Sequence, residues 1–247
     1  MKFFFTSFLS LNLSLLLIVG FYGIGRNSLF IFGNNFKDHF NKTNYFIYYP
    51  IGISLVSFLI YPICLFVNSL FPIYIISFIL IIFGLNELLF IYKIKINKIK
   101  ISQLNIYDLY IYIFIFSYFL LSLAPITTAD ALDYHIGVPK YYLNFETWPY
   151  TPEWFHSRLV GNGEALITIG LILKAKQFPT LLQYFGFLTI IFIFINQLKK
   201  NSDELNFNNF FILTAILSMP VLIKLISTPK PFMLPISLIL SSLYLVY

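Results

Sequence analysis

The side chains that could do chemistry in this chain are concentrated in one segment, residues 125–164. Within it, Asp133 and Tyr134 come three and four residues after Asp130, so the three side chains would share one face of a short helix. A carboxylate on such a face could accept a proton from a nucleophilic hydroxyl. The same spacing suits a structural alternative, in which Asp130 caps the helix and Asp133 completes a capping box. Both interpretations stay open at this point.

Further candidate binding residues lie beside that face and near the end of the chain. His135 is either a site residue or a hydrogen-bonded structural one. His156 and Arg158 could bind an anion, because a guanidinium grips phosphate through two hydrogen bonds, or they could anchor the segment in the membrane interface. Lys230 lies between two prolines and is a lone cation on a stiffened backbone. It could pair with a lipid phosphate, or it could be a snorkelling lysine at a helix end.

Other polar and aromatic residues of the segment have simpler explanations. Glu164 would open a short helix, where a carboxylate meets the helix dipole favourably. The aromatic side chains could stack on sugar rings, but an aromatic belt at the membrane interface is their default role: Trp148, Tyr150, Trp154 and Phe155. No His-x-x-x-His or paired-cysteine spacing occurs, so the sequence predicts no metal ligands, although its scattered carboxylates leave a divalent cation open as a cofactor.

The elements that position these residues are apolar helices. The chain of 247 residues is 59% hydrophobic and 11% charged, with a mean hydropathy of +0.82, which indicates an integral membrane protein rather than a soluble domain. The formal charge of +6 does not indicate nucleic-acid binding, because the basic residues cluster at helix ends. We predict an all-α, polytopic protein with about seven spanning helices: 3–22, 46–67, 71–92, 106–124, 179–198, 208–226 and 232–247.

The basic residues predict which side of the membrane each connection faces. The run at 93–100, the pair Lys199–Lys200 and the linker 23–45 are basic and should be cytoplasmic. All three basic segments can be cytoplasmic only if the segment 125–177 lies outside the cell membrane and the apolar stretch 165–173 does not cross it. At 1.5 Å per residue that stretch would cover only ~14 Å, so we interpret it as a half-embedded or interfacial helix. A crossing helix there is the alternative. Glu87 should reach the cytoplasmic interface near the basic run.

The predicted organisation therefore has three parts: spanning helices in 1–124, an external loop with juxtamembrane helices in 125–178, and spanning helices in 179–247. In the loop, Leu132, Ile136 and Leu143 interleave with Tyr141 and Tyr142 to form an apolar face directed at the membrane. Pro139 should kink or break the loop helix. Because the chain ends inside an apolar stretch, we expect it to be a fragment of a longer protein.

The loop resembles a known family in its motifs. The string ADALDYHIGVPKYYL, with GNGEAL after it, resembles the first external loop of GT-C membrane glycosyltransferases, nearest to protein-mannosyltransferase and aminoarabinose-transferase relatives of family 39. Those enzymes carry an Asp just after an outward-running helix and a Tyr four positions on, as Asp130 and Tyr134 do. The upstream FYGIGRNSLFIFG is also similar. Ala131 replaces an acidic neighbour, and the later TPKPFMLP lacks the family's second carboxylate.

The resemblance implies an enzyme at the external face of a bacterial-type inner membrane. Asp130 would be the catalytic base or the carboxylate that orients the acceptor, and Lys230 would meet the donor's phosphate. Asp133, Tyr134, His135, His156 and Arg158 would line the site. The donor would be a polyprenyl-phosphate sugar and the acceptor a glycan, lipid or protein. Two alternatives remain: a transporter or flippase for a lipid-linked saccharide, and a non-catalytic membrane subunit.

Overall fold

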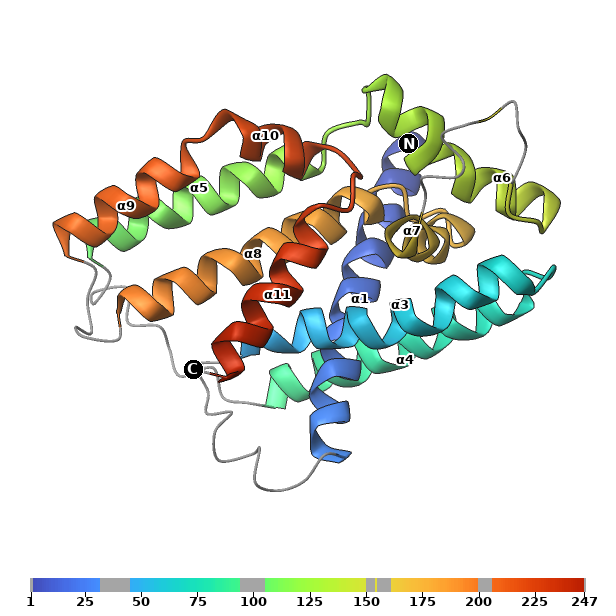
Figure 1. Ribbon diagram of the computed structural model, residues 1–247, viewed down its shortest axis with the longest axis horizontal. Coiled ribbons are helices and arrows are strands. Elements are labelled where there is room, and N and C mark those ends of the chain that lie inside the picture. The colour runs from blue at the N-terminus through green and yellow to red at the C-terminus, as the bar shows by residue number, and fades with distance from the viewer. Residues whose placement is uncertain are drawn as a thin grey trace.

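The computed structural model describes residues 2–31, 45–93, 105–149, 154, 161–199 and 206–246, and every regular element in these ranges is helical. The all-α class is therefore confirmed. Figure 1 shows long helices laid against one another, with a group of short helices at one end. In chain order the elements are α1 (Lys2–Ile31), η1 (Tyr45–Ile47), α3 (Tyr48–Phe66), α4 (Phe71–Lys93), α5 (Ile106–Ser122), η3 (Ala131–His135), α6 (Gly137–Phe145), α7 (Asn162–Ile172), α8 (Phe178–Leu198), α9 (Phe207–Leu217), α10 (Pro220–Ser227) and α11 (Met233–Val246).

Several of these helices are long and apolar enough to cross a bilayer. Four qualify alone, namely α1, α3 together with η1, α4 and α8, and α9 with α10 makes a fifth if the pair, bent by 57°, is one span. Helices α5 and α11 coincide with predicted spans but have only 17 and 14 residues. Length thus supports four or five of the seven predicted spans. The protein is an integral, multi-pass membrane protein.

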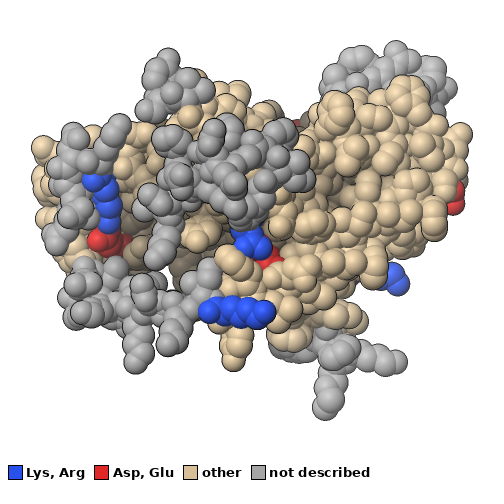
Figure 2. Space-filling view, turned by 90° about the horizontal axis from the view of Figure 1, so that it is seen from below, with Lys and Arg blue, Asp and Glu red and all other residues tan. Residues whose placement is uncertain are grey.

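Figure 2 views the molecule from below, at a right angle to Figure 1. On that face the coloured lysine, arginine, aspartate and glutamate side chains are few, and a blue group touches a red one at the left and again near the centre. Many large apolar side chains are exposed on the described helices, including Phe58, Phe66 and Phe78 at 79%, 81% and 63%. A lipid environment accounts for such exposure.

Helix α1 runs nine residues beyond its predicted end, and this corrects the interpretation of Arg26 and Glu87. The predicted linker 23–45 starts too early, because residues 23–31 are helical. Arg26 lies on α1, with its Nε 2.9 Å from Oε2 of Glu87 on α4 and its guanidinium carbon 3.7 Å from the centre of the Phe90 ring. Glu87 is 5% exposed, so it pairs inside the protein instead of reaching the interface.

Loss of Arg26 is expected to destabilise the fold strongly. Arg26→Met leaves the Glu87 carboxylate buried without its counter-ion, which should lower the free energy of unfolding by about 3–5 kcal/mol. The double variant Arg26→Met/Glu87→Met removes both charges and should recover most of that loss. Thermal unfolding of the purified variants in detergent measures the difference. Equal melting temperatures for the wild type and the single variant would contradict the buried pair.

Helices α1 and α3 cross at very close range. A Cβ atom on Gly25 would lie 1.9 Å from the carbonyl oxygen of Tyr48, and one on Gly52 would lie 1.9 Å from that of Phe21. Only glycine allows the two backbones to approach this closely. The earlier residue of α1 meets the later residue of α3, so the two helices run antiparallel.

Helices α1 and α4 instead run parallel. Gly20 lies against the backbone of Leu80, and Gly23 lies against that of Phe83. Residue numbers rise together along this contact. The start of α1, the end of α3 and the start of α4 therefore lie at the same end of the bundle.

Contacts place the loop and the last interhelical link at this end as well. The Lys176 amide, just before α8, donates to Ser10 Oγ near the start of α1 at 2.8 Å. The Met233 amide at the start of α11 donates to Gln183 Oε1 on α8 at 3.1 Å. At the opposite end, Lys199 Nζ lies 2.9 Å from Asp108 Oδ1. The loop and the link between α10 and α11 thus lie at one end and Lys199 lies at the other, as the predicted orientation has them. Several of the basic residues used to predict the orientation lie outside the described residues, namely those in 32–44 and 94–104, and Lys200.

Helix α7 does not cross the bundle, and it is enclosed by protein. Its residues Glu164–Gly170 are all buried, and it packs against α3, α4, α6 and α8. At 11 residues it covers ~16 Å at 1.5 Å per residue, too little to span. The structure has a short helix over the predicted stretch 165–173, below the length of a candidate span, but its surroundings are other helices and not the membrane interface.

Candidate functional site

The predicted loop helix is broken into two short helices. A turn of π-helix, η3, ends at His135, and α6 begins at Gly137. Pro139 does not cause the break. It is the third residue of α6, where its missing N–H would have no partner within the helix. The i→i+5 bond of η3, from the Ile136 amide to the Ala131 carbonyl oxygen at 2.9 Å, closes the wider turn.

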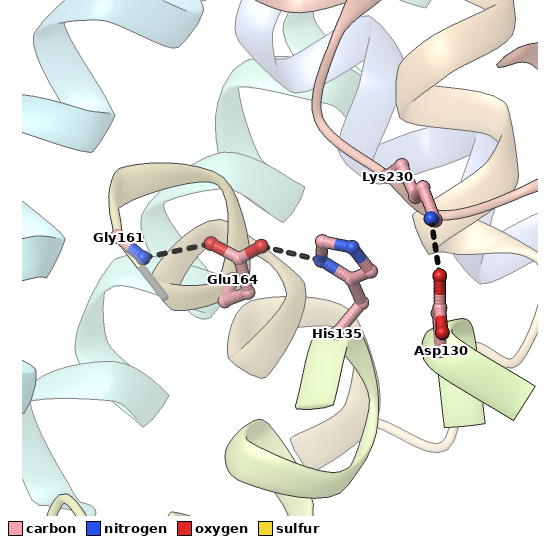
Figure 3. Close-up of polar contacts among 5 residues, drawn as sticks. All are labelled: Asp130, His135, Gly161, Glu164 and Lys230. Atoms are coloured by element: carbon pink, nitrogen blue, oxygen red, sulfur yellow. Dashed lines mark hydrogen bonds and ion pairs between the residues drawn. The ribbon is translucent and has the colours of Figure 1, made fainter. Parts of the chain in front are cut away.

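Asp130 and Lys230, a hundred positions apart, form an ion pair. Lys230 Nζ lies 2.8 Å from Asp130 Oδ2, and the side chains are 15% and 64% exposed, respectively. Lys230 comes from the link between α10 and α11, and Figure 3 shows it reaching down to the start of η3. The capping interpretation of Asp130 is wrong, because its backbone is helical and its side chain makes no capping hydrogen bond. The two residues that the sequence linked to acid–base chemistry and phosphate binding thus lie together.

Asp133 and Tyr134 take different directions from Asp130. Asp133 Oδ1 accepts a hydrogen bond from Trp154 Nε1 at 3.2 Å, which ties η3 to the later part of the loop. Tyr134 lines a cavity described below. The predicted common face assumed α-helical spacing, and the wider π-turn moves Asp133, three residues on, away from the face of Asp130.

His135 and Glu164 form a buried pair that the sequence reasoning missed. His135 Nδ1 lies 2.5 Å from Glu164 Oε1, and the side chains are 7% and 4% exposed. Glu164 Oε2 also accepts from the Gly161 amide at 2.8 Å, so its predicted role at the start of α7 is retained. The two residues are 29 positions apart, and no local spacing relates them. The sequence signal for this pair was the position of Glu164, an ionisable residue in the first turn of the largely apolar helix α7.

A cavity of about 470 Å³ is lined by both residues of the His135–Glu164 pair and by Pro231, which follows Lys230 in the chain. Its polar wall includes Tyr134, His135 and Glu164, and Pro231 beside Lys230 closes another side. The rest of the lining is largely apolar and comes from α3, α7 and α11: Ile53, Leu166, Leu234 and Leu238. Among the described residues, nothing bonds to His135 Nε2, which is buried. The cavity therefore combines apolar walls with a polar end.

Tyr142 fixes α6 against the α3–α4 link. Its hydroxyl donates to the carbonyl oxygens of Val67 at 2.9 Å and Ser69 at 3.2 Å. Burial raises the pKa of Tyr142 to about 12, so the hydroxyl stays a donor. Trp148 packs on the Tyr142 ring, with centroids 5.9 Å apart, and is 7% exposed. Both rings anchor the loop within the protein, so Tyr142 does not belong to a membrane-directed face.

The apolar face of the loop borders a second cavity, of about 650 Å³. Leu132, Ile136 and Leu143 line it. Three exposed lysines stand around it: Lys140, Lys174 and Lys176. The face predicted to point at the membrane thus meets a cationic rim, as an amphipathic anion would require.

Some predicted residues cannot be placed. His156 and Arg158 lie outside the described residues. In the described ranges, no group of three His, Cys, Asp or Glu side chains could hold a metal ion.

The fold and the site define a polytopic α-helical membrane protein with a polar, cavity-lined site at one end of its bundle. The chain belongs to the DUF1420 family, whose N-terminal domain matches residues 96–247. No curated protein and no solved structure matches the chain. The matched region contains Asp130, His135, Glu164 and Lys230 and thus both pairs of the site.

Proposed function

We propose that the protein is a membrane glycosyltransferase that moves a sugar from a polyprenyl-phosphate donor to a glycan, lipid or protein acceptor. The observation that carries the proposal is the Asp130–Lys230 ion pair, whose lysine precedes Pro231 in the lining of an apolar-walled cavity. The resemblance of the loop to GT-C enzymes, based on Asp130 and Tyr134, supports the same reaction. The basic residues of the opposite end support an external position for the site.

The donor's chemistry matches both parts of the cavity. A volume of about 470 Å³ falls within the range typical of small-molecule sites. The walls from α3 and α11 are apolar and would suit the first isoprene units. Lys230 would neutralise the phosphate, which departs with a negative charge when the sugar is transferred. Because Lys230 is largely buried, its charge is screened less by water than a surface lysine's.

Asp130 would act on the acceptor. Its carboxylate is 64% exposed and therefore accessible to a group arriving from outside the cavity. It would orient the acceptor hydroxyl or accept its proton, the two roles that the resemblance leaves open. The donor itself carries the activated sugar, so the site needs no nucleotide.

Lys230→Gln is expected to reduce turnover by about 10²-fold, because it removes the cation that stabilises the departing phosphate. The purified protein, reconstituted into liposomes, is given polyprenyl phosphates carrying single sugars. Release of free polyprenyl phosphate is measured by mass spectrometry, and this readout does not depend on the acceptor's identity. Lys224→Gln, at an exposed lysine of α10, is the matched control and should keep wild-type turnover.

The outcomes separate the candidate functions. Absence of polyprenyl phosphate release with every sugar, and with cell-envelope extract as a source of acceptors, would count against the enzyme. Movement of the intact lipid-linked sugar across the bilayer, without release, would indicate a flippase instead.

A further inference from the structure

We infer that His135, held by Glu164, is the group that takes the proton from the acceptor hydroxyl in this site. The inference rests on the proposed function and decides between the two roles open to Asp130, which then orients the acceptor. The carrying observation is that His135, which is buried to more than nine-tenths and belongs to the lining of the cavity, has no partner for its Nε2 among the described residues.

The hydrogen bonds of Glu164 determine which nitrogen of the His135 ring carries the proton. Oε2 accepts from the Gly161 amide and Oε1 lies 2.5 Å from His135 Nδ1, so both oxygens have partners. A carboxylate that accepts at both oxygens requires the proton of the neutral ring to be on Nδ1. Nε2 is then a bare lone pair, which is what a proton acceptor needs. Figure 3 shows Nε2 on the side of the ring away from Glu164 and toward Lys230.

The alternative acceptor, Asp130, is less suited to this step. Its Oδ2 is held by the Lys230 ammonium at 2.8 Å, so its charge is already engaged. Its exposure also admits water, whereas His135 is shielded within the protein. Electrostatic effects on a proton transfer are stronger in such a water-poor site. The Glu164 carboxylate would stabilise the imidazolium as it forms, and Glu164 is a positioning residue in this role.

The step is balanced in atoms and charge. The acceptor oxygen forms a bond to the anomeric carbon, and the bond from that carbon to the phosphate oxygen breaks. The electron pair leaves with the polyprenyl phosphate beside Lys230. The hydroxyl proton passes to Nε2, and the resulting imidazolium returns it to water once the product leaves. No oxidant, reductant or further reactant is consumed.

His135→Asn tests the step without breaking the buried contact. The asparagine amide can still donate to Glu164 from near the Nδ1 position, but it offers no basic nitrogen in place of Nε2. We expect turnover, measured as polyprenyl phosphate release, to fall about 10²–10⁴-fold. The melting temperature should stay close to that of the wild type. His135→Ala, which leaves Glu164 unpaired, should lose stability as well.

The pH profile distinguishes catalysis from a structural role. Because Nε2 takes the proton in this step, the pH profile of turnover should differ between the wild type and His135→Asn. Other ionisable groups around the ring are Tyr134, Glu164, Asp130 and Lys230. The contribution of Asp130 is measured by the same profile for Asp130→Asn, which should keep the pH dependence of the wild type. Turnover of His135→Asn within about threefold of the wild type would overturn the inference.

The tautomer gives a readout that does not need turnover. In ¹⁵N-histidine-labelled protein, the nitrogen shifts of His135, assigned by the His135→Asn variant, should show protonated Nδ1 and bare Nε2 at neutral pH. A proton on Nε2 would overturn the inference even if sugar transfer is established. If the bare Nε2 is found but no donor is consumed, the proposed function fails while the proton acceptor stands.

Discussion

Asp130→Asn is expected to lower sugar transfer by about 10²-fold or more while leaving the free energy of unfolding nearly unchanged. The carboxylate would orient the acceptor and hold Lys230 in place, and a misplacement of about 1 Å in a reacting group can cost 10²-fold in rate. The asparagine is isosteric but neutral, so it keeps the shape of the contact and loses its charge. The same polyprenyl phosphate assay measures the effect.

The stability side of this prediction follows from exposure. The Asp130 side chain is 64% exposed, and the asparagine keeps an amide oxygen as acceptor for Lys230, which is 15% exposed, so the loss of stability should stay at about 1 kcal/mol. Unfolding therefore cannot account for a large loss of turnover. Asp108→Asn is a matched control, because Asp108 also pairs with a lysine, Lys199 at 2.9 Å, at the opposite end of the bundle. Its turnover should equal that of the wild type.

A charge exchange sharpens the same prediction. The variant Asp130→Lys/Lys230→Asp restores an ion pair but places the cation on η3 and the carboxylate on the α10–α11 link. It should fold, yet it should not recover turnover, because the phosphate would meet a carboxylate. Full turnover in this variant, or in Asp130→Asn alone, would show that the pair is only a structural tie.

Gly52→Ala is expected to have the largest effect on folding. A Cβ atom there would lie 1.9 Å from the Phe21 carbonyl oxygen of α1. A backbone oxygen cannot rotate away as a side chain can, so the helices must separate. We expect a loss of about 3 kcal/mol or more, at the upper end of what overpacking costs, because backbone has to move. The measurements are the yield of monodisperse protein and its melting temperature in detergent.

Gly161→Ala is the control for this effect. A Cβ atom at Gly161 would meet no atom of the described residues within 4 Å, so the same chemical change should be tolerated. Equal melting temperatures for Gly52→Ala and Gly161→Ala would mean that α1 and α3 are not in contact as described.

Much of the fold could be predicted from hydropathy and charge, for reasons that are local. Each predicted span contains a helix, and the basic residues correctly placed the loop and the link 228–232 at one end. Errors arose where a distant partner decides the outcome. Helix α1 can continue past Gly23 because the charge of Arg26 is paired with that of Glu87 on α4. Helix α7 is buried because five other helices pack against it, which its own short sequence does not reveal.

The candidate site shows the same division. Asp130 and Lys230 could be singled out because each stands in a distinctive local sequence, although nothing in the sequence gave their distance. The predicted common face of Asp130 and Asp133 was wrong because η3 adopts a π-turn, and residue spacing alone does not reveal one. The His135–Glu164 pair was missed because each residue had an adequate local explanation. Contacts between separate elements, unlike periodicity, require the folded chain.

The parallel contact of α1 with α4 has a consequence for how the protein is made. Arg26 emerges from the ribosome about sixty residues before Glu87, and a lone arginine is costly within a bilayer. Helix α1 therefore cannot settle into its final position until α4 has entered the membrane. The glycine contacts with α3 and α4 form during the same interval. Membrane insertion of this N-terminal trio should thus be concerted, and the site of the later helices is assembled on a base that is completed first.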